Sequence, residues 1–163
     1  MPRRWNVLFL CSGNSARSVF AEAILNHQGG HAFTAYSAGS HPMGQVRPEA
    51  LRQLRLAGIS SNGLRSKSRD EFSAPSAPRM HFVFTVCDNA AKEVCPIRPG
   101  HPMTAHWGVP DPAAVHGTPE AIACAFHSAF TILERRIVLF LSLPLGTLRR
   151  TAIQHEIDRI GRS

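Results

Sequence analysis

A thiol and a guanidinium stand six positions apart near the start of the chain, at Cys11 and Arg17. A thiolate is a strong nucleophile, and a guanidinium pairs with two oxygens of a tetrahedral oxyanion at once. Gly13, between them, lets the backbone turn so that successive N–H groups point at one anion. The segment therefore predicts a cradle that holds an oxyanion against the Cys11 sulfur. This oxyanion cradle consists of Ser12, Gly13, Asn14, Ser15, Ala16, Arg17 and Ser18.

The surroundings of Cys11 also bear on its protonation state. The Arg17 charge and the dipole of a helix that begins at Ser18 both favour an anion, so we expect a lowered pKa and a thiolate at neutral pH. A structural cysteine with a surface arginine nearby would show the same spacing. The apolar strand before Cys11, the glycine and the helix, all in one register, favour the oxyanion site over this alternative.

Two further cysteines, Cys87 and Cys95, stand eight positions apart in the middle of the chain. Cys87 ends an apolar, strand-like stretch, and residues 88–93 after it are polar or small. Such a segment could bring Cys95 onto Cys87 at a modest entropic cost. Both thiols could also be ordinary small hydrophobic residues. The fourth cysteine, Cys124, falls among apolar helix residues, where we expect it in the core and not in catalysis.

A carboxylate, Asp111, follows a tight turn at residues 108–110 and precedes Pro112. Its carboxyl group could act as a general acid, because an oxygen that departs as hydroxide is a poor leaving group without a proton. An aspartate in this place could equally cap the turn. From the residues alone both interpretations stay open.

The elements that must position these residues alternate between strand and helix patterns. Apolar runs predict strands at 5–10, 33–37, 81–86 and 104–107. Capping and amphipathic patterns predict helices at 18–28, 48–57, 118–141 and 145–160, with a mostly irregular loop at 60–78. This alternation predicts an α/β fold with a four-stranded parallel sheet flanked by helices. Ligands bind beyond the carboxyl ends of such strands, where Cys11, Cys87 and Asp111 would all lie.

Composition limits the other classes of function. The 163 residues, without repeats or linkers, predict one domain over residues 1–163. No stretch approaches the roughly 20 apolar residues of a membrane span, and the first strand is too short for a signal-peptide core. Four cysteines in such a chain indicate a reducing cytoplasm.

The net charge of the chain is +7, but the basic residues are scattered along it. We therefore expect no membrane or nucleic-acid partner. The basic surface could attract small anions or only aid solubility.

The oxyanion cradle resembles the active-site loop of the low-molecular-weight protein tyrosine phosphatase superfamily. Ser15 and Ala16 before the arginine make it more similar to the arsenate reductases of that superfamily. Further landmarks, in the superfamily's order, are Ser37-Ala38-Gly39, Thr85-Val86-Cys87-Asp88, Cys95-Pro96 and His106-Trp107-Gly108-Val109-Pro110-Asp111-Pro112. The resemblance covers nearly the whole chain, and it implies the phosphatase-like fold with flavodoxin-like topology.

Similarity to the thioredoxin-coupled arsenate reductases implies a disulfide relay. Cys11 attacks arsenate while Arg17 and the cradle hold its oxygens, and Asp111 protonates the leaving oxygen. Cys87 then attacks the Cys11–arsenic adduct, arsenite leaves, and Cys95 resolves the Cys11–Cys87 disulfide. The final Cys87–Cys95 disulfide passes to an external thiol, either thioredoxin or glutaredoxin with glutathione. The resemblance implies no bound cofactor, and phosphate and sulfate as competing anions.

Two departures from the family pattern stand out. The enzymes that carry this relay usually space the two later cysteines one residue closer together than Cys87 and Cys95.

Some of these enzymes bind potassium beside the cradle, and Asn14, Glu22 and Ser37 match part of that ligand set. The expected aspartate falls near Lys67, whose charge would compete with a metal ion. We therefore expect no bound metal.

Two other functions fit part of the pattern. A low-molecular-weight protein tyrosine phosphatase would need Cys11, Arg17 and Asp111 but neither later cysteine. Its relatives typically carry tyrosine beside a phosphotyrosine ring, whereas alanines occupy positions 113 and 114 here, which favours a small inorganic substrate. A non-enzymatic oxyanion-binding or redox-sensing partner would need the cradle alone.

Overall fold

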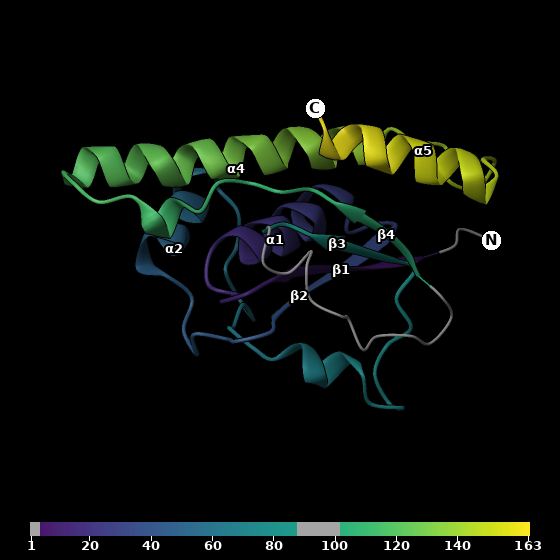
Figure 1. Ribbon diagram of the computed structural model, residues 1–163, viewed down its shortest axis with the longest axis horizontal. Helices are drawn as coiled ribbons and strands as arrows, with labels where there is room; N and C mark the ends of the chain where they lie inside the picture. The colour runs from purple at the N-terminus through teal and green to yellow at the C-terminus, as the bar shows by residue number, and fades with distance from the viewer. Residues whose placement is uncertain (1–3, 88–101) are drawn as a thin grey trace.

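A four-stranded parallel sheet forms the centre of the computed structural model, which describes residues 4–87 and 102–163 (Figure 1). Its strands are β1 (Trp5–Cys11), β2 (Phe33–Gly39), β3 (Phe82–Thr85) and β4 (Met103–His106). They lie in the order β2-β1-β3-β4. The chain leaves β1 to one side for β2 and returns to its other side for β3, so the strand order reverses beside β1. This confirms the predicted sheet and its flavodoxin-like topology, and places the switch point where Cys11 ends β1.

Helices cover the sheet and connect its strands. The α-helices are α1 (Arg17–Gly29), α2 (Pro48–Leu56), α4 (Pro119–Leu141) and α5 (Arg150–Gly161), and two short 3₁₀ turns are η1 (Arg69–Phe72) and η2 (Pro112–Ala114). In Figure 1, α4 and α5 follow one another along the top of the molecule and η1 lies along the bottom, with the sheet between them. No helix in the described part of the chain combines the length and apolar character needed to cross a bilayer.

The last helix begins later than the sequence predicts. The prediction placed its start at residue 145, whereas α5 begins at Arg150. Before it, the chain forms a turn in which the backbone N–H and the hydroxyl of Thr147 both donate to the Pro144 carbonyl. A hydroxyl that bonds locally to the backbone competes with helix formation, and Gly146 adds the backbone entropy that disfavours a helix.

An aromatic cluster ties the strands to the segment that carries Asp111. The Trp107 ring stacks on Phe84 with centroids 4.0 Å apart, and its Nε1 donates to the Ile157 carbonyl at 2.9 Å. Both contacts are fully buried, so residues just after β4 are fixed between β3 and α5. The apolar face of α4 completes this core with Phe126, Ala129, Phe130, Leu133, Ile137 and Phe140.

The expectation that Cys124 is a core residue is wrong, because its side chain is exposed. Buried residues of α4 recur at helical spacing from Phe126 onward. Successive helix residues are about 100° apart, so a position two residues before Phe126 faces away from the core. The apolar composition around Cys124 concealed this orientation.

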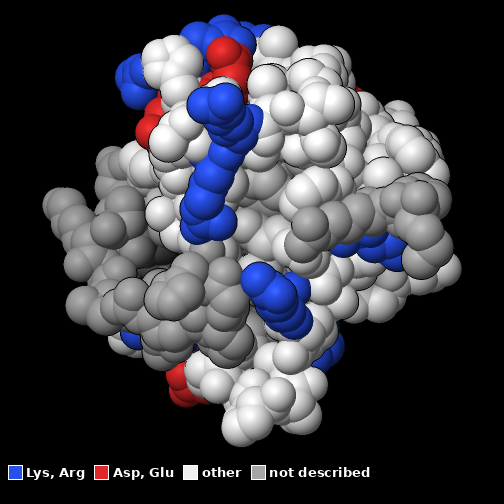
Figure 2. Space-filling model, turned by 90° about the vertical axis from the view of Figure 1, so that its right-hand side faces the viewer, with Lys and Arg blue, Asp and Glu red and all other residues white. Residues whose placement is uncertain are grey.

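Basic side chains lie in separate groups over the face shown in Figure 2, with uncharged surface between them. The arrangement agrees with the scattered pairs of arginines in the sequence. It differs from a continuous basic stripe of the kind that follows a nucleic-acid backbone.

Candidate active site

A second loop holds the oxyanion cradle from outside. Four backbone carbonyls of the cradle region accept hydrogen bonds from residues that follow β2, at 2.9–3.2 Å. The pairs are Ser40 N to Cys11 O, His41 N to Ser12 O, Met43 N to Gly13 O and Arg47 N to Ser15 O. With these carbonyls engaged on the outer side, backbone N–H groups of the cradle other than that of Ser12, which donates to the Cys87 sulfur, can serve an anion on the inner side. Residues 40–47, called the outer loop below, are thus part of the site's construction.

Two residues set the shape of the cradle. Gly39, at the end of β2, has no Cβ, and one placed there would collide with the Ser12 carbonyl oxygen. Asn14 has a left-handed backbone with φ of 48°, a conformation that asparagine tolerates better than most residues. Its fully buried side chain donates to Ser18 and Ser37 at 2.8 and 3.0 Å and accepts from the Lys67 N–H at 2.8 Å. These three bonds hold the left-handed backbone turn at Asn14 in place.

The structure brings Cys11 and Cys87 together in the interior. Their residues are only 4% and 3% exposed, and the Ser12 N–H donates to the Cys87 sulfur at 3.2 Å. A hydrogen bond with Cys87 is the largest cause that raises the Cys11 pKa, and burial is the second. The Arg17 charge and the Ser12 N–H lower this pKa. The prediction of a lowered Cys11 pKa is therefore wrong for this arrangement. The expected relay already placed Cys87 beside Cys11, but the lowered pKa was predicted without the effect of this neighbouring thiol and of burial, which together outweigh the arginine.

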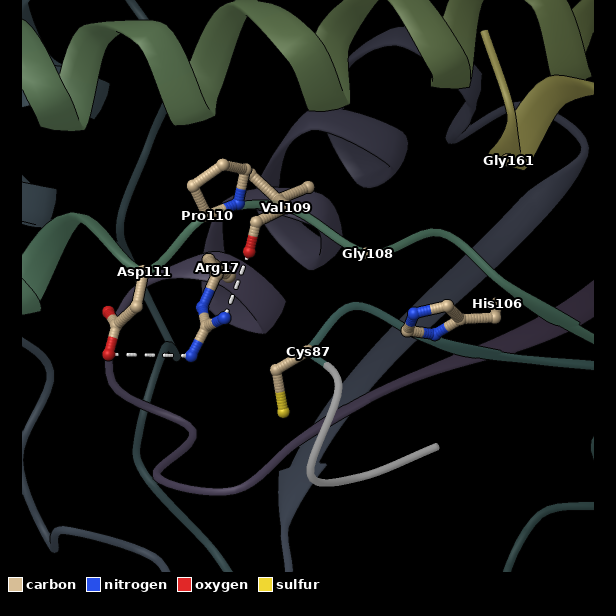
Figure 3. A pocket seen from close by; sticks show the side chains of 8 residues that line it. All are labelled: Arg17, Cys87, His106, Gly108, Val109, Pro110, Asp111 and Gly161. Carbon is tan, nitrogen blue, oxygen red and sulfur yellow. Dashed lines mark hydrogen bonds and ion pairs between the residues drawn. The ribbon is translucent and has the colours of Figure 1, made fainter. Parts of the chain in front are cut away.

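Arg17 contacts the segment that carries the predicted acid. Its Nη2 lies 3.6 Å from the Asp111 carboxylate, and its Nη1 donates to the Val109 carbonyl at 3.0 Å. Asp111 also caps η2, because its other oxygen accepts from the Ala113 N–H at 2.9 Å. Turn capping and a place in the site are therefore compatible. Figure 3 shows Arg17 between Asp111 and Cys87.

Two cavities meet at these residues. One, of about 380 Å³, is lined by the cradle with Cys11, by His41, Met43 and Arg47 of the outer loop, and by Asp111 and Ala113. The other, of about 670 Å³, is lined by Arg17, Cys87, His106, Gly108, Val109, Pro110, Asp111 and Gly161 (Figure 3). Arg17 and Asp111 line both. Cys11 therefore faces one cavity and Cys87 the other, with the Arg17–Asp111 pair between them.

A buried ion pair lies behind the cradle. Lys67 Nζ is 3.6 Å from Glu22 Oε1, and the same oxygen accepts from the Ser37 hydroxyl. Burial raises the Glu22 pKa and lowers the Lys67 pKa, while each partner's charge opposes these shifts. The lysine thus supplies a positive charge beside Glu22, one of the residues that the sequence matched to part of a potassium site. Among residues 4–87 and 102–163, no group of three or more His, Cys, Asp or Glu is placed to hold a metal ion.

Some residues of the site escaped the sequence analysis. Arg136 of α4 donates to the Gly108 carbonyl at 3.0 Å and so fixes the start of the Asp111 segment. Arg47 and His41 line the cradle cavity. For Arg47 and His41, the only signal in the sequence was their position after the second strand. That position alone does not identify which side chains line the site. Cys95, the third thiol of the predicted relay, lies outside the described residues.

Known proteins resemble this chain in sequence and in fold. The family described as low molecular weight phosphotyrosine protein phosphatase matches residues 6–154. An arsenate reductase of Shouchella clausii is 35% identical over 82% of this chain and 93% of its own. A low molecular weight phosphotyrosine phosphatase from Vibrio cholerae has a similar structure, with a TM-score of 0.64 at 20% identity over 82% of this chain and 92% of that one.

A third protein is a thioredoxin-dependent arsenate reductase of Corynebacterium glutamicum. It superposes with a TM-score of 0.57 at 23% identity, over 84% of this chain and 63% of that one, so this chain spans less than two thirds of its length. At such identities the structural matches show the fold alone. The match over residues 6–154, together with the Shouchella relative, shows more: the chain belongs to the low molecular weight phosphotyrosine protein phosphatase family.

Proposed function

We propose that this protein reduces arsenate to arsenite, with Cys11 as the nucleophile. The observation that carries the proposal is the contact between the buried thiols of Cys11 and Cys87 at the end of the oxyanion cradle. A phosphatase needs one thiol, whereas reduction by two electrons needs two. The relative of Shouchella clausii, named arsenate reductase, supports the same substrate.

The first step is a displacement at arsenic. The Cys11 sulfur forms a bond to arsenic while one arsenic–oxygen bond breaks, and Asp111 donates the proton that lets the oxygen leave as water. Arg17 and the N–H groups of the cradle bind the remaining oxygens. Because Cys87 and burial raise the Cys11 pKa, the thiol proton must leave as substrate binds. A basic oxygen of the incoming arsenate dianion can accept it.

The second step is the reduction. The Cys87 thiol gives its proton to an arsenic-bound oxygen and attacks the Cys11 sulfur, so that a sulfur–sulfur bond forms and the arsenic–sulfur bond breaks. Its electron pair stays on arsenic, which goes from the pentavalent to the trivalent state and leaves as arsenite. The two thiols are oxidised to a disulfide in the same step. Ser12 supports this role of Cys87, because its N–H donates to the attacking sulfur.

Recovery of the thiols needs an external reductant. We propose that Cys95 attacks Cys87, and that the Cys87–Cys95 disulfide passes to thioredoxin or to glutaredoxin with glutathione. The Corynebacterium neighbour, described as thioredoxin-dependent, supports a reductant of this class. Phosphate and sulfate would compete with arsenate for the cradle. We also propose that residues 1–163 act as one domain.

The test is arsenite production by the purified protein. Thioredoxin, thioredoxin reductase and NADPH are compared with glutathione, glutaredoxin and glutathione reductase. We expect arsenate-dependent NADPH oxidation with one of the two systems, loss of it in Cys87→Ser, and wild-type rates in Cys124→Ser. Cys124 is a matched control because it is an exposed thiol on α4 outside both cavities. Hydrolysis of an aryl phosphate without arsenite formation would instead support the phosphatase. Oxyanion binding without either activity would support the non-enzymatic partner.

A further inference from the structure

The outer loop brings a second arginine to the oxyanion cavity. Arg47 lines this cavity together with Arg17, and its backbone N–H donates to the Ser15 carbonyl of the cradle at 2.9 Å. The start of the Arg47 side chain is therefore fixed to the loop that would hold the anion. Its guanidinium can move only by rotation about the side-chain bonds.

The Arg47 guanidinium has more donors than it uses. Its Nη2 pairs with the Glu49 carboxylate at 3.1 Å, while its Nε is buried and has no hydrogen-bond partner among the described residues. A buried donor without a partner is costly, and the cost disappears when an acceptor arrives. The side chains of Arg47 and Glu49 are 37% and 33% exposed, so both can rearrange.

Charges around the cavity favour a second cationic contact. Arg17 faces Asp111 at 3.6 Å, and Arg47 faces Glu49, so each guanidinium already has one carboxylate. Arsenate, phosphate and sulfate carry up to two negative charges at neutral pH. If Asp111 carries a proton as the general acid, Arg17 balances one of these charges, and Arg47 is the further cation among the described residues that line this cavity.

We propose that Arg47 is a second anion-binding residue of this cavity and that Glu49 restrains it. Without an anion, Arg47 pairs with Glu49; with a dianion in the cradle, its guanidinium turns to the anion and leaves the carboxylate. The role in turnover rests on the proposed function, whereas the anion binding itself does not. Arg47 acts on substrate capture, so its loss changes KM more than kcat.

A purely structural role makes different predictions. If the Arg47–Glu49 pair only fixes the start of α2, removing either partner affects stability alike and leaves anion affinity unchanged. The proposal instead predicts effects of opposite sign on affinity. Arg47→Gln weakens binding because a charge-assisted contact is lost, and Glu49→Gln strengthens it because the arginine is released.

The test measures sulfate and phosphate binding by calorimetry, without arsenate or reductant. We expect the dissociation constant to rise about tenfold in Arg47→Gln, since a hydrogen bond to a charged group contributes roughly that factor. It should fall in Glu49→Gln, and Glu49→Gln should have no effect when Arg47 is already Gln. Arg52→Gln is the charge-matched control, because Arg52 is exposed on α2, the helix that follows Arg47, and lines a different cavity.

Each outcome decides the proposal. Equal sulfate affinities in Arg47→Gln and Arg52→Gln, or weaker binding in Glu49→Gln, overturns it. If Arg47→Gln does not fold, as judged by circular dichroism, Glu49→Gln and Arg47→Lys carry the test, with tighter binding and near-native binding as the expected results. A protein that binds sulfate as predicted but does not reduce arsenate refutes the proposed function and leaves this proposal intact.

Discussion

Arg17 contacts the Asp111 segment twice, through the carboxylate at 3.6 Å and through the Val109 carbonyl at 3.0 Å. The residue expected to bind the oxyanion therefore also positions the expected acid. Loss of one function at this arginine should bring loss of the other.

Replacing Arg17 with Lys tests this double role. Lysine keeps the charge but has no planar fork, so it cannot pair with two oxygens and also hold Val109. We expect arsenate, phosphate and sulfate to bind roughly 10–100-fold more weakly, from about 1.5–3 kcal/mol of lost charge-assisted bonding, and kcat to fall further. Protection against heat by sulfate measures the first effect and steady-state kinetics the second. Wild-type values in both would refute the cradle.

The two later thiols separate reduction from hydrolysis. Cys87→Ser should stop arsenite release while slow hydrolysis of an aryl phosphate continues, because water, not Cys87, resolves a phosphocysteine. Cys95→Ser should complete one turnover and then stall as a Cys11–Cys87 disulfide, unless a small thiol rescues it. Mass spectrometry of the wild type after arsenate treatment should find Cys87 joined to Cys95. Repeated turnover by both variants with the native reductant would refute the relay.

The contact between the thiols makes Cys11 chemistry depend on pH. Since the folded protein raises the Cys11 pKa above its ordinary value of 9.0, the fold favours the protonated thiol. This contribution to stability is present below that value and is lost as pH rises beyond it. The difference in free energy of unfolding between wild type and Cys11→Ser should therefore shrink above pH 9.0.

A companion measurement identifies the cause. Cys87→Ala removes the first cause of the shift, so the pH midpoint for alkylation of Cys11 should move down. Cys124→Ala should leave that midpoint unchanged, since Cys124 is exposed on α4 and does not line the cradle cavity. An unchanged midpoint in Cys87→Ala would mean that burial alone raises the pKa.

The Lys67–Glu22 pair should behave as a unit. Removing one partner leaves a buried charge without its counterpart, so Lys67→Met should cost about 3–5 kcal/mol of unfolding free energy. The double variant with Glu22→Gln should recover much of this loss, because burial opposes the charged form of both groups. Chemical denaturation of the four proteins gives the coupling directly. Additive losses would show that the pair makes no net interaction.

The fold and the oxyanion cradle could be predicted from the sequence because both depend on residues that are neighbours in the chain. An apolar run, a glycine and a helix start are neighbours in the chain, and Cys11 to Ser18 contains a complete binding loop. The contact of Cys11, at the end of β1, with Cys87, two residues after β3, reverses the pKa prediction made from Arg17 and the helix dipole. Lys67 and Glu22 likewise meet only when the segment just before η1 pairs with the end of β2, through Gly39 and Ser68. Side-chain orientation, as at Cys124, also requires the packed structure.

The larger cavity reaches the Cys87 sulfur from a side that the oxyanion cradle does not share, although Arg17 and Asp111 line both spaces. A compound seated against Cys87 and His106 would leave the cradle accessible to arsenate. Raising the arsenate concentration would not displace it, so its inhibition would be non-competitive. Electrophiles that fit this cavity would thus modify Cys87 and leave Cys11 unmodified. Phosphate mimics, which bind the cradle, could not inhibit the protein in this way.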